Sequence, residues 1–123
     1  MTKKDIAAEF LKLASLGKVK EAYEKYVHPD FIHHNAYFKG DRESLVKGME
    51  ESAAVSANKS LEVVRALEDG DLVATHSRIL RADPNVPEIA VVHIFRFKDD
   101  KIIEEWEVGQ EVPADSPNEN GVF

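Results

Sequence analysis

The sequence gathers side chains that can transfer protons directly after the end of an expected helix. Three of the chain's five histidines lie in the segment Tyr26–Asn35. Imidazole is the side chain best suited to proton transfer near neutral pH. The segment turns extended after His28, because Pro29 disfavours a helical conformation in the residue before it. Polar groups at the start of a strand can face a pocket, so His33, His34 and Asn35 are candidate site residues; a solvated loop that contains histidines is the alternative.

A second set of candidates comes from the hairpin predicted around Asp99-Asp100. If these two residues form the turn, His93 lies opposite Trp106 and Phe95 lies opposite Glu104, all on one face of the sheet. A histidine and a glutamate among aromatic side chains have the composition of a ligand pocket. The alternative is a core histidine bonded to a neighbouring acid, because buried charges need partners. A β-bulge in either strand would change this register.

The opposite face of the same hairpin is charged near the turn and apolar further along, which suits partial exposure or a subunit contact. Its members are Val92, Ile94, Arg96, Ile103, Glu105 and Glu107.

The preceding hairpin supplies one more candidate. With Asp69-Gly70 as its turn, Val63 lies opposite His76, and we expect His76 to point into the pocket, with solvent exposure as the alternative. Neighbours on a strand point to opposite faces, so His33 and His34 cannot easily bind one metal ion. The sequence also lacks a glycine-rich phosphate loop, a Gly-x-Ser-x-Gly elbow and a His-Glu-x-x-His motif. We therefore predict neither a metal nor another cofactor.

The elements that must position these residues follow from the hydrophobic periodicity. Helical spacing predicts helices over about 3–16, 18–27 and 41–56, and a short strand covers about 30–34. Alternation predicts strands over about 61–67, 72–80, 88–98 and 101–108, followed by an irregular tail over about 111–123. This order predicts a single α+β domain, residues 1–123, with helices packed on one face of a curved antiparallel sheet. The space between helices and sheet is where a ligand would bind.

Composition narrows the class of function. The chain has 123 residues, a net charge of −7 and no cysteine. The negative charge argues against partners such as nucleic acids and anionic membranes, and the absence of cysteine excludes thiolate chemistry and disulfides. The sequence shows no signal peptide and no run of about 18 apolar residues, so we expect a cytoplasmic protein.

Several short segments, taken together and in order, resemble one protein family. They are Tyr26, Asp30–Asn35, Gly40, Val92–Phe97, Lys101-Ile102, Glu105–Val108 and Gln110. Over nearly the whole chain they resemble the SnoaL-like polyketide cyclase family, within the nuclear transport factor 2-like fold. The ending Asn118–Phe123 is similar to the tail of bacterial members predicted to catalyse aldol condensation. The resemblance implies a cone-shaped α+β barrel whose curved sheet wraps three helices around a deep pocket, and a homodimer formed through the sheet.

The resemblance also implies roles for single residues. In ketosteroid isomerases, which are similar in fold, the catalytic base matches His34, and a protonated acid that donates to the oxyanion matches His93. The match favours His34 over His33 as the inward-facing residue. A second oxyanion donor of those enzymes, a tyrosine, matches Phe10 here, which argues against steroid isomerisation. Relatives usually have Asp where this chain has Glu107, a position that our predicted register places on the outer face.

The function that combines these observations is cofactor-independent acid–base catalysis on a small apolar carbonyl compound, of the aldol, cyclase, isomerase or dehydratase type. His34 would remove a proton next to the carbonyl, His93 would hydrogen-bond the oxygen, and Glu104 would orient His93 or share its proton. His76 is a further catalytic candidate. The substrate-binding wall is expected to comprise Phe10, Tyr23, Asn35, Phe95 and Trp106. The alternatives are a non-catalytic binding module for a small apolar ligand and an interaction protein with a filled interior.

Overall fold

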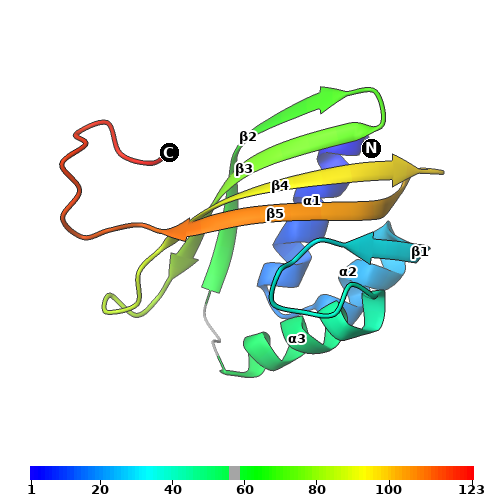
Figure 1. Ribbon diagram of the computed structural model, residues 1–123, viewed down its shortest axis with the longest axis horizontal. Coiled ribbons are helices and arrows are strands. Elements are labelled where there is room, and N and C mark those ends of the chain that lie inside the picture. The colour runs from blue at the N-terminus through cyan, green and yellow to red at the C-terminus, as the bar shows by residue number, and fades with distance from the viewer. Residues whose placement is uncertain (56–58) are drawn as a thin grey trace.

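The computed structural model describes residues 1–55 and 59–123 and contains three helices and five strands (Figure 1). The helices are α1 (Lys3–Ser15), α2 (Val19–Tyr26) and α3 (Arg42–Val55). The strands are β1 (Val27–His33), β2 (Lys59–Asp69), β3 (Leu72–Arg81), β4 (Ile89–Lys98) and β5 (Lys101–Glu111). All predicted elements are present; residue 56, the predicted end of the third helix, lies outside the described residues.

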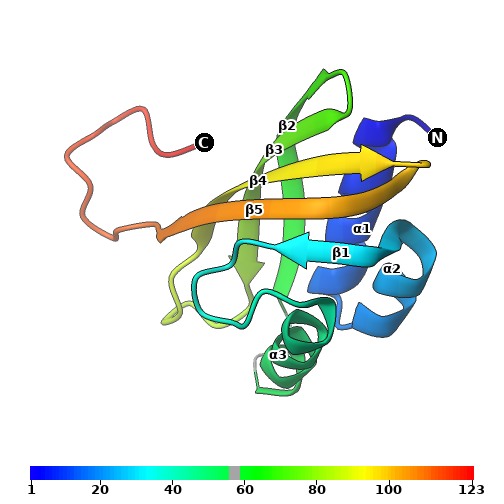
Figure 2. The same ribbon diagram turned by 45° about the vertical axis from the view of Figure 1, so that its right-hand side comes forward.

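The strands form one sheet in the order β1-β5-β4-β3-β2. β2 to β5 are an antiparallel meander, as predicted, but β1 pairs with β5 in parallel, so the sheet is mixed rather than purely antiparallel. A hairpin would force two strands to run antiparallel, but α3 and the strands β2 to β4 lie between β1 and β5 in the chain. The two strands can therefore pair in parallel. The sheet is open and curved, and the three helices lie on one side of it (Figures 1 and 2).

An aromatic cluster joins the helices to the concave face of the sheet. Phe10 of α1 is only 1% exposed. Its ring meets the rings of Tyr23 in α2 and Phe95 in β4 edge-on, with centroids 5.2 and 5.9 Å apart. Edge-to-face pairs add to the free energy gained by burial alone. A capping box in which Thr2 and Asp5 bond each other's backbone N–H starts α1 and fixes where Phe10 falls.

The predicted register of the last hairpin is wrong beyond its first pairs. Asp99 and Asp100 do form the two-residue turn, both with positive φ, and Phe97 lies opposite Ile102 as expected. A β-bulge then leaves Ile103 without a partner. From there on every pair is shifted by one residue, so that the expected partners Glu104 and Trp106 lie on the outer face of the sheet. The observed inward pairs are Phe95 with Glu105 and His93 with Glu107.

The turn of the β2–β3 hairpin is also shifted, because Asp69 pairs with Leu72 and leaves Gly70-Asp71 as the turn. His76 therefore lies opposite Arg65 rather than Val63. On β3 the buried residues are those with odd numbers, among them Thr75 and Ser77.

His76 consequently faces outward, and our expectation that it points into a pocket is wrong. There it bonds Arg65 and stacks on the ring of Phe123, which the irregular tail brings back over the sheet. None of the helices in the described part of the chain has the length and apolar character needed to cross a membrane.

Replacing Phe10 by alanine tests the aromatic cluster. We expect Phe10→Ala to lower the free energy of unfolding by about 3–5 kcal/mol, because it removes a buried ring and leaves a cavity. Urea denaturation followed by circular dichroism measures this loss. Tyr37→Ala is the control, since Tyr37 is 90% exposed and its truncation should change stability by less than about 0.5 kcal/mol. A loss below about 1 kcal/mol for Phe10→Ala would contradict this view of the core.

Candidate active site

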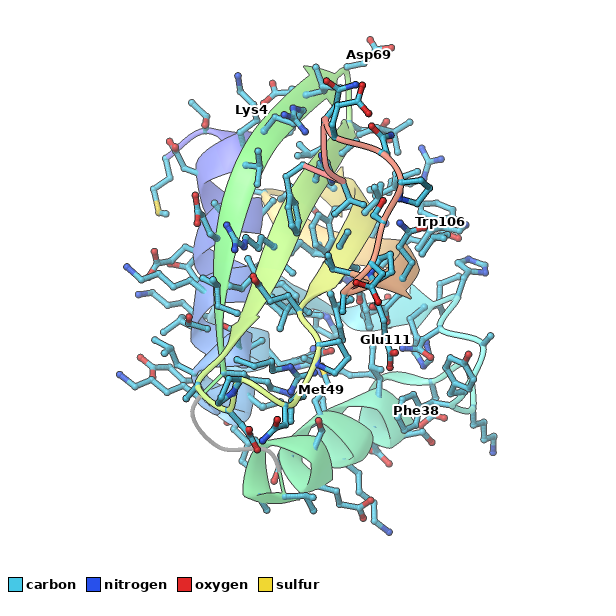
Figure 3. All side chains as sticks on the ribbon, turned by 90° about the vertical axis from the view of Figure 1, so that its left-hand side faces the viewer. Lys4, Phe38, Met49, Asp69, Trp106 and Glu111 are labelled. Carbon is cyan, nitrogen blue, oxygen red and sulfur yellow. The ribbon has the colours of Figure 1, made fainter. Side chains whose placement is uncertain are left out.

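A cavity of about 240 Å³ lies between α1, α3 and the concave face of the sheet. Figure 3 shows Met49 of α3 between this helix and the sheet, whereas Trp106 lies beside β5, on the side of the sheet away from α1. Most of the lining is apolar. The apolar lining residues are Phe10, Leu11, Ala14, Phe38, Leu45, Gly48, Met49, Leu61 and Ile79. The polar ones are Ser15, Asn35, Ser52, Lys59, His93, Glu105 and Glu107.

Three ionisable side chains meet at the wall of this cavity. His93 Nε2 lies 3.3 Å from Glu107 Oε2 and 3.6 Å from Glu105 Oε1. The side chains of His93 and Glu105 are 8% and 7% exposed, and that of Glu107 is partly buried, at 27% exposed. Glu105 and Glu107 are two positions apart on β5 and so share its inner face, next to His93 on β4. We call these residues the buried triad.

The close contacts change the proton affinities of the buried triad. Burial raises the pKa of Glu105 to about 7, and the neighbouring Glu107 adds to the rise while His93 opposes it. Burial would also lower the pKa of His93, but its hydrogen bond to Glu107 and the charges of both glutamates raise it instead. For Glu107, burial is outweighed by the bonds from His93 and Asn35, so its pKa is lowered. The arrangement therefore favours a charged His93–Glu107 pair beside a Glu105 that exchanges its proton near neutral pH.

The loop after β1 holds Glu107 in place. The side-chain amide of Asn35 donates to Glu107 Oε1, while its own carbonyl oxygen accepts from the backbone N–H of Tyr37. His33, which is buried, fixes the same loop. Its Nδ1 accepts from the backbone N–H of Asn35 at 3.1 Å, so its Nε2, 2.7 Å from the carbonyl oxygen of Lys39, carries the proton and donates. Both ring nitrogens of His33 are thus engaged in positioning the loop.

His34 lies on the outer face of the sheet, and the inward histidine of the pair is His33. The side chain of His34 is 45% exposed, bonds Glu104 at 2.8 Å and stacks on Trp106 at 5.0 Å. The structure therefore brings three predicted site residues together, but away from the cavity. The bulge at Ile103 turns Glu104 and Trp106 to the outer face. His34 faces outward because it follows the inward-facing His33 and neighbouring residues of an extended chain point to opposite faces.

The other predicted site residues divide between the cavity and the core. Phe10, Asn35 and His93 line the cavity, as expected. Phe95 stacks in parallel on the ring of His93, with ring centroids 5.6 Å apart, and so helps to orient the imidazole. Tyr23 is buried, and its hydroxyl donates to the sulfur of Met49 at 3.2 Å rather than facing the cavity.

In the described part of the chain, the buried triad could also hold a metal ion. One imidazole nitrogen and one oxygen of each carboxylate lie within 4.8 Å of one another. Imidazole binds a metal only in its neutral form. The hydrogen bond to Glu107 and the charges of the two glutamates raise the pKa of His93, so a metal ion would have to displace a proton to bind there. The prediction that the chain uses no metal or other cofactor stays a prediction.

The chain belongs to the SnoaL-like family, because the model of the SnoaL-like domain matches residues 8–105. This confirms the resemblance found in the sequence. No curated protein sequence matches the chain.

Solved structures of low sequence identity share the fold of this chain. IdmH from Streptomyces antibioticus, a proposed polyketide cyclase, superposes with a TM-score of 0.74 at 20% identity over 89% of this chain and 93% of that one. AclR from Streptomyces galilaeus, a proposed hydroxylase, gives 0.75 at 20% identity over 89% and 79%. A nuclear transport factor 2-like protein of unknown function from Cytophaga hutchinsonii gives 0.70 at 17% identity over 89% and 91%. These likenesses establish the nuclear transport factor 2-like fold.

Sequence reasoning missed Glu105, Glu107 and Lys59 as cavity residues. Glu105 and Glu107 lie on either side of Trp106 in a strand, so the sequence shows that they share a face. Which face this is depends on the bulge at Ile103, and no pattern in the sequence predicts that bulge. Lys59 lies at the start of β2, where a charged side chain is typical of a solvated strand end.

The raised pKa of Glu105 makes stability depend on pH. Between its ordinary value of 4.5 and about 7, the folded state holds more protons at Glu105 than the unfolded state, so the free energy of unfolding falls as the pH rises through this range. Glu105→Gln removes this dependence. At about pH 8 the variant should be more stable than wild type by roughly 3 kcal/mol, and at about pH 5 by less than about 1 kcal/mol. Denaturant titrations at both pH values measure this, and a variant less stable at the higher pH would contradict the buried, proton-sharing triad.

Proposed function

We propose that this chain is a cofactor-independent acid–base catalyst that moves a proton next to the carbonyl group of a small apolar compound. The observation that carries the proposal is the buried triad at the wall of an apolar cavity, with one carboxyl group whose pKa lies at about 7. A general base or acid works best when its pKa lies near the working pH. Perturbed groups of this kind in a pocket are typical of catalytic sites.

Each member of the triad has a separate role in this proposal. The carboxylate of Glu105 takes a proton from the carbon next to the carbonyl, and the electron pair of the broken C–H bond forms the enolate. Protonated His93, beside Glu105, stabilises the negative charge that appears as the proton leaves. Glu107 keeps His93 protonated and is itself held by Asn35. Glu105 thus takes the role first expected of His34, and Glu107 replaces Glu104 as the partner of His93.

The same first step serves several reactions. If Glu105 returns its proton to another carbon, the result is isomerisation. If the enolate carbon attacks a second carbonyl, the proton passes to the new alkoxide, and the result is an aldol addition or cyclisation. The SnoaL-like family and the cyclases of similar fold favour this group of reactions.

Exchange of the acidic protons of tetralone with deuterated water tests the proposal. We expect wild type to accelerate the exchange, measured by proton NMR, and Glu105→Gln to lower the rate by about 100-fold or more. Glu104→Gln is the matched comparison, because the neighbouring carboxylate lies on the outer face and its loss should leave the rate nearly unchanged.

Two results would contradict this assignment. Equal losses in the two variants, or a loss only in Glu104→Gln, would remove Glu105 from the chemistry. Binding of tetralone without exchange above the solvent rate would instead favour the alternative of a binding module.

Self-association through the outer face of the sheet is a separate proposal. This face exposes Ile32, Val92, Ile94 and Val108, by 48%, 41%, 38% and 76%. A charge placed there would be buried in a dimer, which is unfavourable. We expect light scattering to show a dimer for wild type and a monomer for Ile94→Lys, whereas Val55→Lys, on α3, should stay dimeric. A monomeric wild type would refute the proposal.

A further inference from the structure

A second charged group faces the cavity far along the chain from the triad. Lys59 begins β2, is partly buried and lines the cavity together with Leu61, two positions further along. Opposite this pair on β3 are Arg81 and Ile79, in register. Because Ile79 also lines the cavity, the two strands present Lys59 and Arg81 on the same inner face.

Lys59 has no negative partner in the described part of the chain. Its ammonium group donates a hydrogen bond of 3.0 Å to the hydroxyl of Ser52 in α3, and no carboxylate lies within ion-pair distance of it. Its pKa is lowered by burial and, to a smaller degree, by the positive charge of Arg81. The side chain of Lys59 is only partly buried, and its bond to Ser52 is exposed to solvent. A cation that lines the cavity without a carboxylate partner, in a protein whose net charge is −7, is suited to an anion brought by a ligand.

We propose that Lys59 binds a carboxylate of the ligand, so that the cavity takes small apolar oxo acids. The carboxylate pairs with Lys59 and the hydroxyl of Ser52, while the carbonyl end lies against Glu105 and His93. The assignment of the carbonyl end rests on the proposed function; the assignment of the carboxylate end does not.

The lining of the cavity agrees with a ligand that has polar groups on an apolar body. Besides Lys59 and the triad, most of the wall is apolar, formed in part by Leu11, Leu45 and Leu61. The volume of about 240 Å³ is smaller than that of pockets for drug-sized ligands, which suits a compact molecule. A carboxylate bound at one end would also fix which carbon of the ligand meets Glu105, which is how remote binding contributes to catalysis.

A matched pair of ligands tests the carboxylate site. Benzoylpropionate is an apolar keto acid, and its methyl ester has the same ketone without the charge. We expect calorimetry at neutral pH to show that wild type binds the acid at least about tenfold more tightly than the ester, the effect of one charged hydrogen-bonded contact. Lys59→Met should reduce this ratio to about one while leaving the affinity for the ester nearly unchanged.

Three further variants make the result specific. Lys59→Arg keeps the charge and should restore the preference for the acid. Lys47→Met, which removes an exposed lysine of α3, should keep the preference and so controls for net charge. Glu105→Gln should also keep it, so that loss of proton exchange and loss of carboxylate binding are separate results. Lys59→Gln replaces the methionine variant if that protein does not fold by circular dichroism.

The proposal is overturned if wild type does not prefer the acid, or does not bind it at millimolar concentration. It is also overturned if the variants without the ammonium group keep the preference. A preference that disappears only in those variants supports it, whether or not the protein exchanges the protons of a ketone.

Discussion

The close packing of two carboxyl groups, one of them fully buried, against one buried imidazole on the inner face of the sheet is the constraint on which the structure depends. Isolated charges in such a place are strongly unfavourable, so the three groups must share protons and hydrogen bonds. Their neighbours serve this arrangement. Phe95 stacks on His93, the loop held by His33 brings Asn35 to Glu107, and the aromatic cluster around Phe10 fixes the helices that close the cavity.

One extra residue in β5 decides which acids belong to this group. Without the bulge at Ile103, Glu104 would face inward and Glu105 outward. The bulge turns Glu104 and Trp106 to the outer face, where they meet His34, and it turns Glu105 and Glu107 toward His93. Bulges are frequent near functional sites, and here a local irregularity of the backbone chooses the chemistry of the cavity.

The sequence predicted the order of elements, the α+β class and the inward direction of His93, because periodicity and turn residues determine these features locally. The family followed from the resemblance of several short segments. It did not predict the partners of His93. Alternation shows which residues share a face but not which face is buried, and an unpaired residue changes the answer for a whole strand. The same limit applies to His33 and His34, and to Lys59, whose role depends on contacts with α3 and β3.

In the proposed chemistry Glu105, buried beside a charged His93–Glu107 pair, exchanges its proton near neutral pH. A carbon-13 NMR titration of the glutamate carboxyl groups, with Glu105→Gln used to assign the signal, measures this exchange. We expect Glu105 to titrate with a pKa of about 7. A Glu105 that titrates at the ordinary value of 4.5 would contradict it, because that carboxyl group would then be neither desolvated nor suited to the proposed proton transfer.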